Sequence, residues 1–267
     1  MYKVAIIYTG VAYESEVNNI RLQELLGKIK VIGIGTPDIY AKNMDGYPVT
    51  SIENILNQNW DYLLVAGQEQ NFAEIKKLLV SVGVEEDRIF SIKIFSLPIF
   101  DFEQYVKFIN EKVSIVSNHC WGGFTYHSLK AEFLLPFINM FIPQEDYIRL
   151  LENFDDYMKE EIKYYKNEYE PNLQSEYPVA LLGDVELHFN HYKSFEGAKE
   201  KWDQRKQRIN RNNLFVEMQT ENEELAKRFN KLPYNKKIVF VPFETQLESA
   251  VSLKKMNENY TGHFMRA

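Results

Sequence analysis

The chain has 267 residues, a formal charge of -7 and 45% hydrophobic residues. This composition excludes disordered, collagen-like and disulfide-dense proteins, and it supplies one large core or two moderate ones. The acidic balance provides no overall positive field for nucleic acid. Cys120 is the single cysteine, and no stretch is long and apolar enough to span a bilayer. We therefore expect a cytoplasmic protein without a membrane span or a nucleic-acid partner.

The first hundred residues alternate short apolar runs with amphipathic stretches. Apolar residues occupy consecutive positions in the runs, which is typical of parallel strands that are buried on both faces. Strands are predicted at 4–8, 31–34, 62–66 and 89–92, with helices at 15–26, 50–59 and 72–82. This order predicts a doubly wound α/β sheet.

The segments 45–49 and 60–67 of this half are similar to Rossmann-like domains that bind nucleotides or coenzyme A and accompany sugar-modifying enzymes. That resemblance implies a parallel-sheet domain over residues 1–110. A sheet that has lost its cofactor and only supports its neighbour is the alternative.

A helix at 100–111 is expected to link this domain to a second, three-layer α/β domain over 111–267. Its apolar runs predict strands at 113–116, 179–182, 185–189, 214–216 and 238–241. Its helical stripes predict helices from just after Pro143 to Met158, at 195–209 and at 221–229. We therefore predict two α/β domains in sequence.

A polar loop with two glycines directly follows the strand predicted at 113–116. Cys120 falls where the strand turns into a helix, and helix amides there can stabilise a thiolate and lower the pKa of the thiol. We therefore expect Cys120 to be a nucleophile. The alternative is a buried cysteine that acts as a small apolar residue. The neighbours expected to bind substrate are Asn118, Trp121, Gly122 and Gly123.

Acids and histidines are concentrated over 184–192. In a strand, Asp184, Glu186, His188 and Asn190 would share one face, so that an acid could orient an imidazole as general base. We predict catalytic roles for Asp184, His188 and His191. Asp184 and Glu186 also resemble the acidic element with which many nucleotide-sugar glycosyltransferases hold a divalent metal. A solvated strand face is the remaining interpretation.

The helix predicted at 195–209 has an excess of basic residues in an otherwise acidic chain. Arg205 and Arg208 offer forked donors to a phosphate or a carboxylated sugar. Trp202 offers a stacking face. We predict that all three bind substrate, and an attraction between this helix and the acidic segment 144–176 is the alternative.

Four segments together resemble a bacterial family, the domain of unknown function nineteen-nineteen. They are 117–123, 137–143, 183–192 and 198–210, and the resemblance covers about 113–245. Members are often labelled exopolysaccharide biosynthesis proteins. The resemblance therefore implies a pathway, but no reaction and no catalytic residues.

We expect a transferase of exopolysaccharide or other cell-surface polysaccharide assembly, which moves an acyl group onto a sugar with Cys120, His188 or His191, and Asp184. One alternative is a metal-dependent nucleotide-sugar glycosyltransferase that uses Asp184 and Glu186. Another is a non-catalytic module that binds a glycan or a nucleotide. The expected partner is a sugar or nucleotide-sugar substrate. The cofactor is either a nucleotide sugar or acyl-coenzyme A, and a divalent metal is expected only in the glycosyltransferase alternative. The sequence does not predict the oligomeric state.

Overall fold

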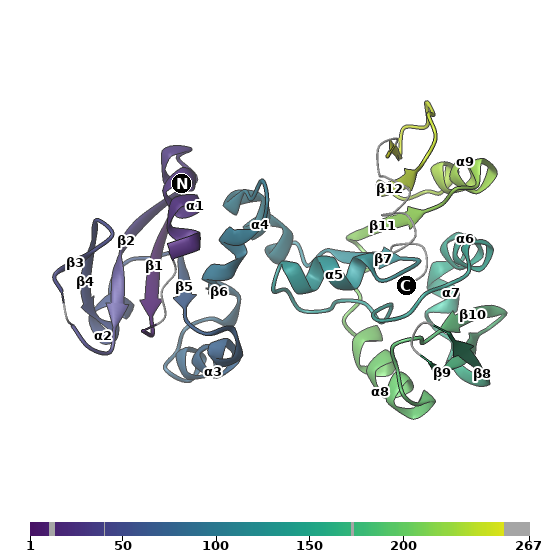
Figure 1. Ribbon diagram of the computed structural model, residues 1–267, viewed down its shortest axis with the longest axis horizontal. Helices are drawn as coiled ribbons and strands as arrows, with labels where there is room; N and C mark the ends of the chain where they lie inside the picture. Colours follow the sequence, from purple (N-terminus) through teal and green to yellow (C-terminus); the bar gives the residue numbers. More distant parts are fainter. Residues whose placement is uncertain (11–13, 40, 172–173, 254–267) are drawn as a thin grey trace. The chain divides into compact units, whose positions relative to one another are not determined.

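The computed structural model describes residues 1–10, 14–39, 41–171 and 174–253 (Figure 1). The described chain is a mixed α/β protein with parallel sheets and helices, and it divides into two compact units. Unit 1 comprises Met1–Glu111 and Ser128–Ala131, and unit 2 comprises Lys112–His127 and Glu132–Ala267. Within the described residues, no helix has both the length and the apolar character needed to cross a membrane.

Unit 1 is built on a six-stranded sheet in the order β3-β4-β2-β1-β5-β6. All neighbouring strands are parallel except the β3–β4 hairpin. The strands are β1 (Tyr2–Tyr8), β2 (Ile29–Thr36), β3 (Asn43–Met44), β4 (Tyr47–Ser51), β5 (Tyr62–Ala66) and β6 (Ile89–Ser91). The parallel strands predicted from consecutive apolar residues are thus confirmed, whereas the β3–β4 hairpin was not predicted.

Helices of unit 1 cover both faces of this sheet (Figure 1). Val4 and Ile6 of β1 belong to one buried cluster and Ala5 and Ile7 to another. Successive side chains of a strand point to opposite faces, so a strand buried on both faces needs an unbroken apolar run. The helices are α1 (Glu14–Leu25), α2 (Ile52–Leu56), α3 (Phe72–Ser81) and α4 (Phe102–Asn110), with short 3-10 segments at Glu69–Asn71, Glu86–Arg88 and Ile92–Ser96.

Helix α2 begins later than predicted. Thr50 lies in β4, and Ser51 is the N-cap, with its side chain accepting a hydrogen bond from the Asn54 amide. Thr50 instead pairs with Gly35 of β2, so the helix cannot begin at residue 50 as predicted.

Unit 2 contains a four-stranded sheet in the order β13-β12-β11-β7, in which every pair is parallel. Its strands are β7 (Ser114–Ser117), β11 (Leu214–Gln219), β12 (Lys236–Val241) and β13 (Ala250–Ser252). Helix α5 (Trp121–Ser128) follows β7, and α9 (Glu223–Lys231) connects β11 to β12. Because the strands are parallel, the loops that follow β7 and β11 leave the same edge of the sheet.

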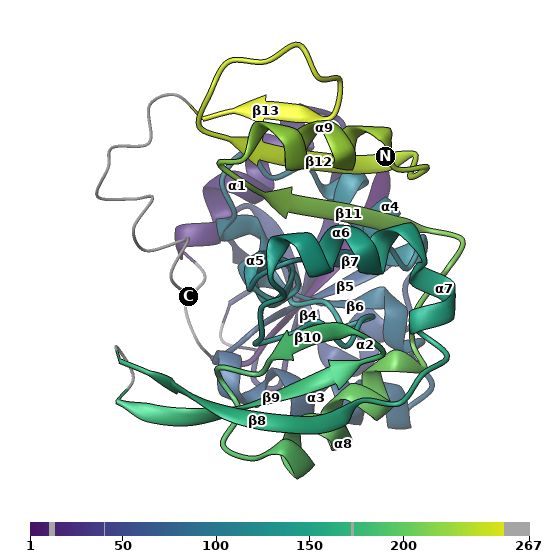
Figure 2. The same ribbon diagram turned by 90° about the vertical axis from the view of Figure 1, so that its right-hand side faces the viewer.

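A second sheet of unit 2 is antiparallel, in the order β10-β9-β8. Its strands are β8 (Lys163–Glu170), β9 (Ser175–Leu182) and β10 (Val185–His188), and the helices near it are α6 (Gln144–Glu152), α7 (Phe154–Tyr157) and α8 (Phe195–Lys206). Helix α6 contacts both α9 and β10, and Figure 2 shows it between them. One continuous apolar core joins these elements.

Two expectations for unit 2 are corrected, and one long strand was missed. The helix predicted from Pro143 to Met158 is broken into α6 and α7 at Asn153, whose φ of -135° is not helical. The helix predicted at 195–209 ends at Lys206. Strand β8 was not predicted, because its alternating tyrosines and charges carry no apolar run.

Candidate functional site

A polar cluster lies where β7 and β11 end. We call Ser117, His119 and Glu217 the carboxyl-edge cluster. Glu217 is paired in register with Ser117, its side chain is completely buried, and its Oε2 accepts a hydrogen bond of 2.6 Å from the Ser117 hydroxyl. The Tyr147 hydroxyl of α6 lies 2.8 Å from the Glu217 carbonyl oxygen and 3.0 Å from that of Val116, which joins the two strands.

His119 completes this cluster and has a defined tautomer. Its Nδ1 accepts a hydrogen bond of 3.1 Å from the Trp121 amide, so the neutral imidazole carries its proton on Nε2. Nε2 lies 3.4 Å from Glu217 Oε1. Neither of these two buried atoms has a hydrogen bond of good geometry to any residue that the structure describes.

Glu217 is a candidate that the sequence interpretation missed. It follows Val216 and precedes Met218, both of which are completely buried. A charged residue inside a strand that is buried on both faces is costly unless it has a specific role. That interruption of an apolar run was the available signal.

Cys120 lies next to this cluster in sequence but is buried from solvent. Its residue is 6% exposed, and burial raises the pKa of the thiol, with an opposing backbone hydrogen bond from Met140. The expected lowering of this pKa by helix amides is therefore wrong, because desolvation of the thiolate outweighs it. Cys120 has the character of a small apolar residue here.

The other predicted residues of this loop make internal contacts. Asn118 is buried, its Oδ1 accepts from the Gln219 amide at 3.2 Å, and its carbonyl accepts from Ile142 at 2.9 Å. The ring of Trp121 packs on Phe215 and Phe240. A Cβ at Gly122 would lie 3.3 Å from Ser117 Cβ, and one at Gly123 would lie 3.5 Å from Ile138. These contacts give each residue a packing role.

A second polar cluster lies on one face of the β8–β9–β10 sheet. We call Lys166, Glu168, Tyr177, Glu186 and His188 the hairpin cluster. His188 Nε2 lies 3.2 Å from Glu186 Oε2, and Nδ1 lies 3.3 Å from the Tyr177 hydroxyl and 3.4 Å from Glu168 Oε2. The Tyr177 hydroxyl in turn donates to Glu168 at 3.0 Å. An acid, an imidazole and a second acid thus share one face, as predicted for Glu186 and His188.

Burial and charge act in opposite directions on His188. Its ring stacks on Phe141 with centroids 4.4 Å apart, and burial lowers the pKa of the imidazole, whereas Glu168 and Glu186 raise it less strongly. The net direction is downward, so the neutral base is favoured. A hydrogen bond from Lys166, with its Nζ 2.6 Å from Glu168, lowers the pKa of Glu168. Glu168 is therefore held as a carboxylate.

Asp184 does not occupy the position predicted for it. Gly183 has a φ of +62°, and Gly183 and Asp184 form the turn between β9 and β10. The hydrogen bond from Tyr157 lowers the pKa of Asp184, and desolvation together with that bond raises the pKa of Tyr157 to about 12. Arg149 lies 3.3 Å from Asp184. Glu186, and not Asp184, is the acid next to His188.

His191 is exposed, and its Nε2 lies 3.5 Å from the buried Asn190 side chain. For the metal alternative, Asp184 and Glu186 each lie near a cation, Arg149 and Lys166 respectively. Across the described ranges, no group of three or more His, Cys, Asp or Glu side chains is arranged to hold a metal ion.

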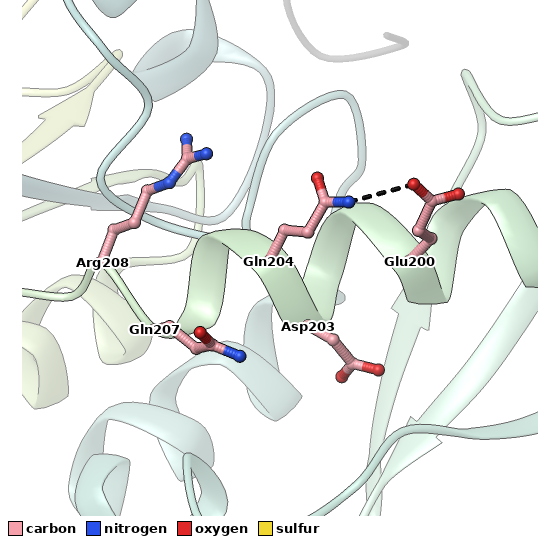
Figure 3. Close-up of a pocket in the computed structure, with 5 residues that line it drawn as sticks. All are labelled: Glu200, Asp203, Gln204, Gln207 and Arg208. Atoms are coloured by element: carbon pink, nitrogen blue, oxygen red, sulfur yellow. Dashed lines mark hydrogen bonds between the residues drawn. The ribbon is translucent and has the colours of Figure 1, made fainter.

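The residues predicted on the helix at 195–209 differ in burial: Trp202 is buried, Arg205 is partly buried, and Arg208 is exposed beyond the end of α8. Trp202 is 1% exposed within the core, so the prediction that it offers a stacking face is wrong. Arg205 donates to the Tyr192 hydroxyl at 2.9 Å and lies over the Phe133 ring. Arg208 lies 3.0 Å from Glu132 and lines a surface pocket (Figure 3). The other residues of that pocket are Glu200, Asp203, Gln204 and Gln207.

A short segment connects the two clusters. Phe141 and His188 exchange backbone hydrogen bonds of 3.0 Å, and the next residue, Ile142, donates to the Asn118 carbonyl. Residues 140–142 therefore run between the loop of Cys120 and the strand of His188. Unit 2 thus brings three distant stretches of the chain together, but their polar groups form two clusters.

Unit 2 is thus defined by a four-stranded parallel sheet, an antiparallel hairpin sheet and two histidine–carboxylate contacts. The chain belongs to the family described as domain of unknown function (DUF1919), whose model matches residues 91–266. Residues 1–90 match a second model, described as C2185-like, N-terminal. The family resemblance found in the sequence is confirmed over a longer stretch than expected.

The chain is also similar to a protein of Haemophilus influenzae that is named only as an uncharacterized protein. The two are 33% identical over 138 residues, which is 50% of this chain and 64% of the relative. The match thus spans less than two thirds of the relative's length.

Proposed function

We propose that the protein is a transferase of exopolysaccharide or other cell-surface polysaccharide assembly, and that it moves an acyl group onto a sugar hydroxyl. The observation that carries this proposal is the hairpin cluster, where His188 is held between Glu186 at 3.2 Å and Glu168 at 3.4 Å. An imidazole oriented by a carboxylate is an arrangement suited to general-base chemistry. The pathway is inferred from the family resemblance.

The contacts of His188 suggest how it is oriented. Tyr177 donates its proton to Glu168, so its oxygen is free to accept the Nδ1 proton of His188. That arrangement leaves Nε2 unprotonated, and the Glu186 carboxylate 3.2 Å away stabilises a proton that Nε2 takes up. The lowered pKa of His188 keeps the ring neutral and able to accept a proton.

His188 and Glu186 differ in solvent exposure, and we propose different roles for them. The side chain of His188 is 7% exposed and that of Glu186 is 32% exposed. We assign Glu186 to contact the acceptor hydroxyl and His188 to receive the proton from it through Nε2. The acceptor oxygen then forms the ester bond to the acyl carbon of a thioester donor, the carbon–sulfur bond breaks, and the departing thiolate takes up the proton from His188.

The surroundings of the hairpin cluster suit a sugar. The Glu168 and Glu186 carboxylates and the Lys166 ammonium offer both acceptors and donors for sugar hydroxyls. Tyr165, half exposed beside Lys166, offers an aromatic face. These groups match a neutral sugar better than an extended apolar ligand.

We propose direct transfer to the sugar without a thioester on the protein. A covalent route needs a thiolate that can reach the donor, and burial both hides Cys120 and raises the pKa of its thiol. We also propose that unit 1 is a Rossmann-like domain that binds the donor. Its parallel sheet has helices on both faces, which is typical of nucleotide-binding domains. Acyl-coenzyme A is the donor that this resemblance favours.

The test is turnover by the purified full chain, measured as release of free coenzyme A from acyl-coenzyme A donors in the presence of neutral sugars. We expect acceptor-dependent release in the wild type and in Cys120→Ser, and its loss in Glu186→Gln. An acyl group trapped on Cys120, or loss of turnover in Cys120→Ser alone, contradicts direct transfer. Sugar binding without any turnover favours the non-catalytic module.

A further inference from the structure

Two groups make opposite demands on the protonation of His119. The Trp121 amide donates to Nδ1 at 3.1 Å, and this bond requires an unprotonated Nδ1. The Glu217 carboxylate lies 3.4 Å from Nε2, is completely buried, and is stabilised most by a full positive charge on the ring. The neutral ring satisfies the amide and the charged ring satisfies the carboxylate.

The Trp121 amide is the first N–H group of helix α5. The first N–H groups of a helix have no partner within the helix, so an acceptor outside it stabilises the first turn. His119 supplies that acceptor in its neutral form only.

We propose that His119 is a pH-sensitive cap of helix α5. When neutral, its Nδ1 caps the Trp121 amide. When it is protonated, the ring gives up that bond and forms an ion pair with Glu217, and the first turn of α5 is released. The released turn contains Trp121 and directly follows Cys120. Acidification therefore exposes Cys120 and its loop to solvent.

The groups that face His119 support a two-state arrangement. From β11, Glu217 attracts the charged ring, and from β7 the Ser117 hydroxyl fixes the other carboxylate oxygen at 2.6 Å. From α6, the Tyr147 phenol bonds to the backbone carbonyl of Glu217, and burial keeps the pKa of that phenol far above neutral pH. The neighbouring Cys120 thiol also stays neutral under acidic conditions. His119 is thus the one imidazole in this set, and it lies between a donor amide and a buried carboxylate.

The experiment uses the full chain labelled with 15N. Histidine side-chain spectra identify the His119 tautomer, and exchange of the Trp121 amide, corrected for its intrinsic rate, is followed from about pH 8 to about pH 5. We expect Nδ1 to be unprotonated at the upper pH. Loss of a cap costs about 1 kcal/mol, so exchange protection should fall about fivefold on acidification.

His119→Asn keeps a side-chain acceptor for the Trp121 amide but does not titrate. We expect it to remain protected across the whole range, while Glu217→Gln moves the transition to lower pH because the anion is gone. Protonation of Nδ1 in the wild type at pH 8, or an equal loss of protection in His119→Asn, overturns the proposal. If His119→Asn does not fold, the tautomer and the protection of the wild type decide the question.

Discussion

Tyr147→Phe tests whether the ends of β7 and β11 are held together by one buried hydroxyl. Tyr147 is completely buried, and its hydroxyl is 3.0 Å from the carbonyl oxygen of Val116 and 2.8 Å from that of Glu217. Phenylalanine fills the same space but leaves both carbonyls without this donor. An unsatisfied buried polar group costs about 1–3 kcal/mol, so the free energy of unfolding should fall by that amount.

Tyr157→Phe is the matched control for this prediction. Tyr157 also donates through its hydroxyl, but its acceptor is Asp184, which is 64% exposed, so water can replace the lost bond. We expect its loss of stability to stay below about 0.5 kcal/mol. Urea unfolding followed by circular dichroism, with an unchanged slope, measures both variants. Equal losses for the two variants would refute the role given to the buried hydroxyl.

Three further predictions concern residues whose expected roles the structure changes. Gly122→Ala should be less stable than Gly123→Ala by about 1 kcal/mol, since its Cβ would lie 3.3 Å from Ser117 Cβ, and equal melting temperatures would contradict this. Trp202→Ala should lower the free energy of unfolding by about 3–5 kcal/mol, measured by chemical denaturation, because it leaves a cavity in the core. A variant that loses activity but keeps its stability would instead support the sugar-stacking role. Burial raises the pKa of Cys120, so the stability that its neutral thiol contributes is present below the unfolded pKa of about 8.5 and is lost as pH rises through the folded pKa. The pH dependence of unfolding should therefore be flatter in Cys120→Ala above that pH, and identical curves would argue against burial of the thiol.

The parallel strands of both units could be predicted because they need consecutive apolar residues. Residues 4–8 and 62–66 have that pattern and form β1 and β5. Strand β8 could not be predicted in this way, because its side chains are mostly exposed or half-buried and polar. The break at Asn153 likewise arises from tertiary packing, which local helical periodicity does not encode.

The candidate sites could be predicted from the sequence only in part. The alternation of Glu186 and His188 correctly predicted that they share a face, since the period of a strand is two residues. The same alternation predicted that Asp184 shares this face, which is wrong. Gly183 has a left-handed conformation and places Asp184 in a turn. Glu217 was missed because its partners, Ser117 and His119, are about a hundred residues away in sequence.

The most direct test of the proposed transferase is kcat/KM for His188→Asn beside Asp184→Asn, with the free energy of unfolding measured for both. If His188 receives the acceptor proton through Glu186, kcat/KM should fall by about 10²–10⁴-fold in His188→Asn. Asp184→Asn should stay close to the wild type, because Asp184 pairs with Tyr157 and Arg149 in the turn. A folded His188→Asn variant with wild-type kcat/KM would contradict the account.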